Sequence, residues 1–238
     1  MQNRVWLVET PGEKFTESEV PIRSLQSNEV LVRIAASGVN PLDTKIRAGK
    51  ATHAKQPLPA VLGLDMAGTV EEVGSGVTTF RVGEEVYGLV GGVGGRQGTL
   101  AEFVIAGAGL LARKPGNLSF REAAALPLST ITAWEGLVDR AQVHATQKVL
   151  IHAGAGGVGH VAVQIARAFE AEVFATVSPS KISWKGLAQL PSTTIPAQLT
   201  STSACSPMGS ASTSSMTPLV VQRSTHPSRQ CADTPATL

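Results

Sequence analysis

Short hydrophobic runs, separated by polar turns, make up roughly the first 110 residues of the chain. The runs are Arg4–Val8, Glu29–Ile34, Met66–Val70, Val86–Val90 and Leu100–Val104. Turn-forming residues lie between them, including Pro11-Gly12, Gly74-Ser75-Gly76 and the cluster Gly91–Gly95. Strand-length runs punctuated by glycine and proline predict a compact, mostly antiparallel β domain.

The pattern changes near residue 119, where helix-forming residues replace the strand-like runs. We expect helices over Phe120–Ala125 and Ile131–Leu137, strands over Lys148–His152 and Glu172–Val177, and a helix between these strands that ends near Phe169. A strand, a helix and a second strand in this space form a βαβ unit. The chain is therefore expected to have an α/β fold, with a β domain followed by part of a parallel α/β domain.

A glycine-rich loop joins the first of these two strands to the helix. Its residues, Gly154, Ala155, Gly156, Gly157, Val158 and Gly159, fit the pattern G-x-G-x-x-G. In this context the first glycine permits a tight turn, the second lets the backbone approach a pyrophosphate, and the third lets helix and strand pack closely. The loop therefore predicts a dinucleotide site, although a tight turn without a ligand would have the same spacing.

The residues after the second strand bear on which dinucleotide is bound. An acidic residue there would bind the ribose 2′-hydroxyl of NAD. The sequence instead reads Val177-Ser178-Pro179-Ser180-Lys181, without an acid. The hydroxyls of Ser178 and Ser180 and the cation of Lys181 suit a 2′-phosphate. We therefore expect NADPH as the cofactor, with an ordinary polar turn as the alternative interpretation.

A second candidate segment runs from Asn40 to Lys45. Asn40 as N-cap, Pro41 in the first helical position and Asp43 in the third resemble a capping box. That local role explains these residues without a ligand, so the segment alone does not predict a function.

Several motifs in a fixed order resemble the zinc-independent quinone oxidoreductases of the medium-chain reductase superfamily, the zeta-crystallin-like family. They are Gly38–Lys45, Leu62–Val70, Val73–Val77, Gly83–Tyr87, Ala124–Pro127 with Thr132-Ala133, and the glycine loop. The resemblance implies a GroES-like substrate domain over residues 1–118 and a partial Rossmann domain over 119–181. It also implies hydride transfer from NADPH to a quinone or another α,β-unsaturated carbonyl. Asn40, Asp43, Lys45 and Thr132 would line the nicotinamide and substrate cleft.

The chain differs from the zinc-dependent branch of that superfamily. That branch has cysteine where Asn40 stands and a His-Glu pair where Leu64 and Asp65 stand, and this chain has no counterpart of its four-cysteine lobe. Without thiolate and imidazole ligands the site cannot hold a tetrahedral zinc ion, so we expect no metal. Family members often have tyrosine where Lys45 stands, and the substrate range is left open.

Composition excludes some other classes of function. Residues up to Lys181 contain 17 basic and 17 acidic side chains, so no charge excess indicates nucleic acid. No run reaches the roughly 18 apolar residues of a membrane span. The first ten residues lack the apolar core of a secretory signal, and we expect a cytoplasmic protein.

Residues 182–238 are rich in Ser, Thr and Pro and are expected to be a low-complexity, disordered tail. Read in a shifted frame, the codons of residues 212–221 permit F-D-I-V-Y-D-T-V-G-G, which resembles the continuation of the family. Residues 182–190 and 228–235 give similar results. We therefore consider a frameshift near Lys181. The alternative to an active reductase is a truncated, non-catalytic fragment or binding module, for which the homo-oligomer possible in the family is doubtful.

Overall fold

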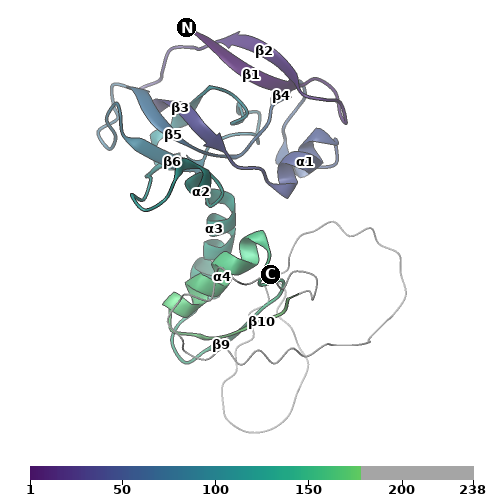
Figure 1. Ribbon diagram of the computed structural model, residues 1–238, viewed down its shortest axis with the longest axis vertical. Coiled ribbons are helices and arrows are strands. Elements are labelled where there is room, and N and C mark those ends of the chain that lie inside the picture. The colour runs from purple at the N-terminus through teal and green to yellow at the C-terminus, as the bar shows by residue number, and fades with distance from the viewer. Residues whose placement is uncertain (178–238) are drawn as a thin grey trace. The chain divides into compact units, whose positions relative to one another are not determined.

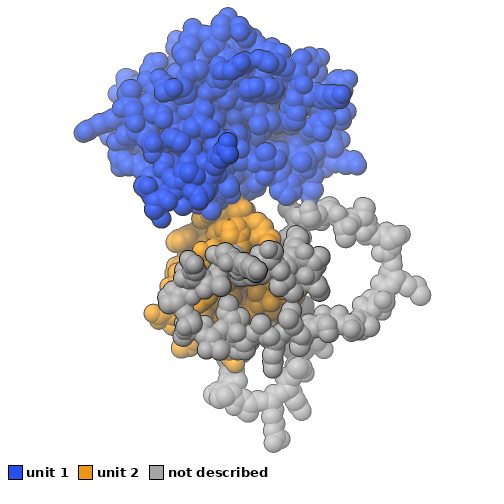
Figure 2. Space-filling view, viewed as in Figure 1, with its two compact units in different colours: residues 1–128 blue, residues 129–238 orange. Residues whose placement is uncertain are grey.

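The structure is a computed structural model that describes residues 1–177 (Figure 1). The described chain divides into two compact units, residues 1–128 and the residues from Ser129 onward (Figure 2). The first unit extends past residue 118, where strand-like runs give way to helix formers. The domain limits given above stay a prediction, and the expected tail lies outside the described residues.

Two antiparallel sheets form most of the first unit. The smaller sheet has the order β2-β1-β4, and the larger has the order β7-β3-β5-β6-β8. The strands are β1 (Gln2–Val8), β2 (Thr16–Pro21), β3 (Glu29–Ser37), β4 (Ala60–Val61), β5 (Asp65–Val73), β6 (Glu85–Leu89), β7 (Phe103–Gly107) and β8 (Ala112–Arg113). This arrangement confirms the antiparallel β domain that the alternating runs predict.

Short helices connect and cover these strands. They are α1 (Pro41–Arg47), α2 (Phe120–Ala124) and the 3-10 turns η1 (Thr52–Ala54) and η2 (Ala108–Leu110). Helix α2 begins at a capping box in which Ser119 and Glu122 satisfy each other's backbone N–H groups. Its buried face, Ala123 and Ala124, packs with Ala67 of β5. The main core of the unit consists of buried valines with Met66 and Phe80 between the strands of the larger sheet.

The second unit contains the βαβ arrangement expected from the sequence. Helix α3 (Pro127–Trp134) continues into a π-helical turn, η3 (Glu135–Arg140), and β9 (Lys148–Ile151), α4 (Gly157–Ala168) and β10 (Glu172–Ala175) follow. Strands β9 and β10 are parallel, with Lys148 opposite Glu172 and Ile151 opposite Ala175. Helix α4 buries Val161, Ala162 and Ala166 against β9 and against Leu137. The glycine loop thus lies between a buried strand and an amphipathic helix.

Candidate functional site

The glycine loop is held in place by the residue that follows β10. The Thr176 carbonyl accepts the Gly154 N–H at 2.9 Å, and its hydroxyl accepts the Ala153 N–H at 3.2 Å. The same hydroxyl lies 3.1 Å from Nδ1 of His152. Ala153 has a φ of 52°, which is uncommon for a residue with a β-carbon. Thr176 could not be singled out from the sequence, because it falls inside the strand expected over Glu172–Val177, whereas β10 ends at Ala175.

The glycines of the loop differ in the space around them. A β-carbon on Gly159 would lie 2.1 Å from the Ala153 carbonyl oxygen, and one on Gly154 would lie 2.7 Å from the Ala175 β-carbon. These two glycines are therefore required for close packing of loop, strand and helix. A β-carbon on Gly156 would lie 3.1 Å from the Ala153 oxygen, which is tight but less severe.

Gly157 has no such packing reason to be glycine. Its β-carbon would meet only the Ser129 hydroxyl, at an ordinary 3.6 Å, and the residue is exposed. At the start of a helix the N–H groups of Gly157, Val158 and Gly159 have no intrahelical partner and attract anions. An open glycine beside such N–H groups is what close approach of a diphosphate requires, so the loop fits a dinucleotide.

In the first unit, Asn40 and Asp43 form the beginning of α1. Oδ2 of Asp43 accepts the Asn40 N–H at 2.8 Å, which is the carboxylate half of the expected capping box. The Asn40 side chain points to another residue: its Nδ2 donates to Oδ2 of Asp65 at 3.0 Å. Both side chains are buried, so helix capping explains only part of this segment.

Asp65 joins the Asn40 segment to Leu128, the last residue of the first unit. The residue is 1% exposed, and its two carboxylate oxygens lie 3.2 Å from the Leu128 backbone nitrogen, whose N–H they accept. Burial raises the pKa of Asp65, against the opposing effect of the Asn40 hydrogen bond. Sequence analysis named Asp65 only in comparison with the zinc branch. An acid within the apolar run Val61–Val70 was the signal that could have marked it.

Asp43 has an unusual electrostatic environment. Its Oδ1 accepts the Gly63 N–H at 3.2 Å, so both carboxylate oxygens bind backbone donors. Burial nevertheless dominates and raises the pKa of Asp43 from 3.8 to about 6. Lys45 is half-buried on the same helix.

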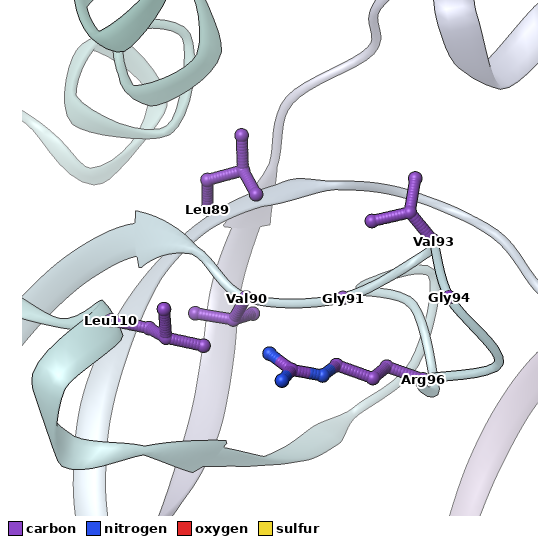
Figure 3. Close-up of a pocket in the computed structure, with 7 residues that line it drawn as sticks. All are labelled: Leu89, Val90, Gly91, Val93, Gly94, Arg96 and Leu110. Carbon is purple, nitrogen blue, oxygen red and sulfur yellow. The ribbon is translucent and has the colours of Figure 1, made fainter. Parts of the chain in front are cut away.

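A cavity of about 370 Å³ adjoins this segment, and Gly38, Val39, Asp43 and Thr44 form part of its wall. Another cavity, of about 290 Å³, lies beside the Gly91–Gly95 loop, where the Arg96 side chain extends toward Val90 and Leu110 (Figure 3). Of the candidate residues that the structure describes, Asp43 lines the first of these two cavities, and none lines the second.

Comparison with known proteins agrees with this arrangement. Residues 26–116 match the family model of the alcohol dehydrogenase GroES-like domain. The chain is 41% identical over 172 residues to a chloroplastic NADPH-dependent alkenal/one oxidoreductase of Arabidopsis thaliana, covering 70% of this chain and 44% of the relative. It is 40% identical over 174 residues to the quinone oxidoreductase of Sus scrofa, covering 73% and 51% respectively.

A solved structure also resembles this chain. An alcohol dehydrogenase superfamily protein of Novosphingobium aromaticivorans is 55% identical, with a TM-score of 0.75 over 76% of this chain and 55% of that chain. This chain belongs to the medium-chain dehydrogenase/reductase superfamily. Within the superfamily it is similar to quinone oxidoreductases and alkenal reductases, and its fold is a GroES-like β domain followed by a partial α/β region. The chain spans about half the length of the curated relatives it matches.

The positions at which zinc-dependent medium-chain enzymes bind their metal hold other residues here. Leu64 is buried and offers only hydrocarbon, and Asn40 is hydrogen-bonded to Asp65. Within residues 1–177, no three or more His, Cys, Asp or Glu side chains are grouped to hold a metal ion. Asn40 and Asp65 therefore do not fit a tetrahedral zinc site with thiolate and imidazole ligands.

The remaining candidate residues lie in both units or outside the described part of the chain. Asn40, Asp43 and Lys45 lie together on or beside α1, whereas Thr132 is exposed on α3 in the second unit. Ser178, Ser180 and Lys181 lie outside the described residues, so their contact with a 2′-phosphate stays a prediction. Among the helices described, none has the length and apolar character needed to span a bilayer.

Proposed function

We propose that this chain binds NADPH and reduces the carbon–carbon double bond of an α,β-unsaturated carbonyl, such as an enone or a quinone, without zinc. The observation that carries the proposal is the open position of Gly157 at the start of α4, where no atom of residues 1–177 explains the missing side chain. NADPH supplies the hydride when it is bound. The chain itself supplies binding, orientation and exclusion of water.

The residues of the glycine loop would hold the diphosphate. Backbone N–H groups of Gly157, Val158 and Gly159 would donate to its oxygens, while Gly154 and Gly156 allow the turn. Ser178, Ser180 and Lys181 would bind the 2′-phosphate. The NADPH-dependent relative from Arabidopsis thaliana supports this choice of nucleotide.

The segment from Asn40 to Lys45, together with Thr132, would line the substrate cleft. Asp65 holds the Asn40 amide in one orientation, so Asn40 would present fixed polar atoms to a substrate. The zinc-dependent reaction on alcohols needs a Lewis acid, and the residues at positions 40, 64 and 65 do not fit the ligand set that would hold it. Small quinones and enones are thus the proposed substrates, and the cytoplasm is the proposed location.

A second candidate function is a GroES-like binding module without catalysis. The first unit has its own sheets and its own buried core, which favours a β domain that is stable by itself. A thermal-shift experiment separates the two. The reductase proposal predicts a higher melting temperature with NADPH than with an equal concentration of NADH, because ligand bound to the native state stabilises it by mass action.

The variant Lys181→Ala should lose the difference between the two nucleotides, and Lys14→Ala, far away in sequence, should keep it. No shift with either nucleotide would favour the binding module. A larger shift with NADH in the parent chain would reject the assignment of NADPH.

A further inference from the structure

The cavity beside the Asn40 segment has a second wall made of large apolar side chains. Trp6 on β1, Phe15 just before β2, and Leu100 line the cavity together with the α1 residues. Trp6 is 37% exposed, Phe15 41% and Val39 76%. Large apolar groups exposed around one cavity are typical of a place where an apolar ligand is bound.

Arg47 fixes this wall to α1. The Arg47 carbonyl accepts the Gly12 N–H at 2.7 Å, and its Nε donates to the Glu13 carbonyl at 2.8 Å. The guanidinium carbon lies 5.5 Å from the centre of the Phe15 ring. None of the ion pairs found within residues 1–177 includes Arg47. Its contacts are thus with the β1–β2 loop, which it holds against the end of α1.

The polar groups around the cavity already have partners. Asp43 accepts two backbone N–H groups, and the Thr44 hydroxyl donates to the Pro41 carbonyl at 2.8 Å. Arg47 donates to the loop carbonyls. An apolar ligand group would leave these hydrogen bonds intact and would gain contact with Trp6, Phe15 and Val39.

We propose that this cavity binds the apolar substituent of the enone substrate, and that Phe15, positioned by Arg47, determines the length of substituent accepted. The inference rests on the proposed function, because the cavity shares Asp43 and Thr44 with the segment Asn40–Lys45 assigned to the substrate cleft. Its volume of about 370 Å³ is at the lower end of ordinary ligand pockets, which suits an alkyl chain or one ring.

Binding of two saturated ketones, 2-butanone and 2-nonanone, tests the cavity without turnover. Calorimetric titration of the parent chain should show tighter binding of 2-nonanone, by about three- to fourfold for each methylene that enters the cavity. Phe15→Ala should weaken 2-nonanone binding about tenfold and leave 2-butanone unchanged. Phe174→Ala removes a comparably exposed phenylalanine from β10 and should change neither affinity.

A second variant fills the cavity. Val39 is largely exposed, so Val39→Trp should fold normally and exclude 2-nonanone while 2-butanone still binds. Arg47→Lys keeps the charge but not the planar fork of donors, and should weaken only the longer ketone. The proposal would be overturned if the parent bound both ketones with equal affinity. It would also be overturned if Phe15→Ala and Val39→Trp lost equal affinity for both ketones.

Reduction of 3-buten-2-one and 3-nonen-2-one with NADPH then separates this inference from the proposed function. A KM that rises in Phe15→Ala only for 3-nonen-2-one, with kcat unchanged, supports both. If the chain discriminates between the saturated ketones but reduces neither enone, the result supports the cavity as a binding site and rejects the proposed activity. If both enones are reduced and neither KM depends on Phe15, the result rejects the proposed role of the cavity and leaves the proposed activity standing.

Discussion

At the scale of single residues, the glycine loop shows what the sequence could and could not predict. Its position and spacing were readable because strand, glycines and helix follow one another. The sequence could not predict the separate roles of the glycines. The space around Gly154 and Gly159 is set by Ala175 and Ala153, whose positions depend on folding. From the sequence we expect a ligand to approach both Gly156 and Gly157 closely, and the structure leaves more room at Gly157 than at Gly156.

The contrast between two glycines can be tested by substitution. Gly157→Val should weaken NADPH binding tenfold or more, because the side chain would fill the space assigned to the diphosphate. Its melting temperature without nucleotide should stay near that of the parent, since no neighbouring atom of the described residues lies within 3.4 Å of the new β-carbon. Fluorescence titration with NADPH measures the affinity. Unchanged affinity in a folded Gly157→Val protein would remove the basis of the nucleotide site.

Asp43 predicts a dependence of stability on pH. Its pKa is raised from 3.8 to about 6 by burial, so the folded chain holds this proton more tightly than the unfolded chain. The free energy of unfolding should then fall as pH rises from about 4 to about 6, by up to ~3 kcal/mol. The pKa of Asp65 is also raised by burial, and Asp65 adds a change in the same direction.

Urea unfolding at a series of pH values measures this effect. Asp43→Asn should come closest to the parent in stability at pH 4, where the Asp43 carboxyl of the folded parent is protonated and neutral like the amide. It should also lose less stability between pH 4 and pH 6 than the parent. Asp139→Asn, at an exposed position, is the control and should follow the parent. An equal slope in Asp43→Asn would contradict the assigned pKa.

At the scale of elements, short apolar runs between turns predicted most of the longer strands. Strands β1, β3 and β5 each contain a predicted run, and β6 covers Val86–Leu89 of the run Val86–Val90. Strand β2, with the sequence Thr-Glu-Ser-Glu-Val-Pro, was missed. Strand β2 pairs only with β1 and is mostly exposed, so its order comes from that pairing and not from burial of its own side chains. The fifth run was expected over Leu100–Val104, but β7 covers Phe103–Gly107 because its pairing with β3 sets the register.

The βαβ unit offers a prediction at this scale. Gly159→Ala places a β-carbon 2.1 Å from the Ala153 carbonyl oxygen, so α4 must move away from the loop. Such overpacking typically costs about 1–3 kcal/mol. Amide hydrogen exchange should become faster in β9 and α4, while β3 and β5 keep their protection. Gly157→Ala is the matched control and should exchange at the rate of the parent. Faster exchange in Gly157→Ala, or an unchanged exchange rate in Gly159→Ala, would contradict the packing role of Gly159.

At the scale of the whole molecule, two compact units correspond to a GroES-like β domain and a partial α/β region of the medium-chain superfamily. The sequence predicted this order because motifs from both parts occur in one succession. The contact of Asn40 with Asp65 and of Asp65 with Leu128 could not be predicted, since the partners are 25 and 63 residues apart in the chain. The frameshift hypothesis concerns residues outside the described part, and sequencing of the coding DNA around Lys181 tests it.

The whole protein should also contain no stoichiometric zinc. Asn40 and Leu64 replace the cysteine and histidine of the zinc-dependent branch, and neither side chain is a zinc ligand of the usual kind. Elemental analysis of the purified protein should find well below one zinc per chain, and chelators should leave reductase activity unchanged. One tightly held zinc per chain would overturn the assignment to the zinc-independent branch.

The most direct test of the account follows the hydrogen that is transferred. The protein is incubated with 3-nonen-2-one and NADPH carrying deuterium at the transferred position of the nicotinamide, and the products are analysed by mass spectrometry. The account predicts 2-nonanone with one deuterium at C4, the former β-carbon, and a proton from water at C3. Formation of 3-nonen-2-ol, or no reduced product from protein that binds NADPH, would contradict it.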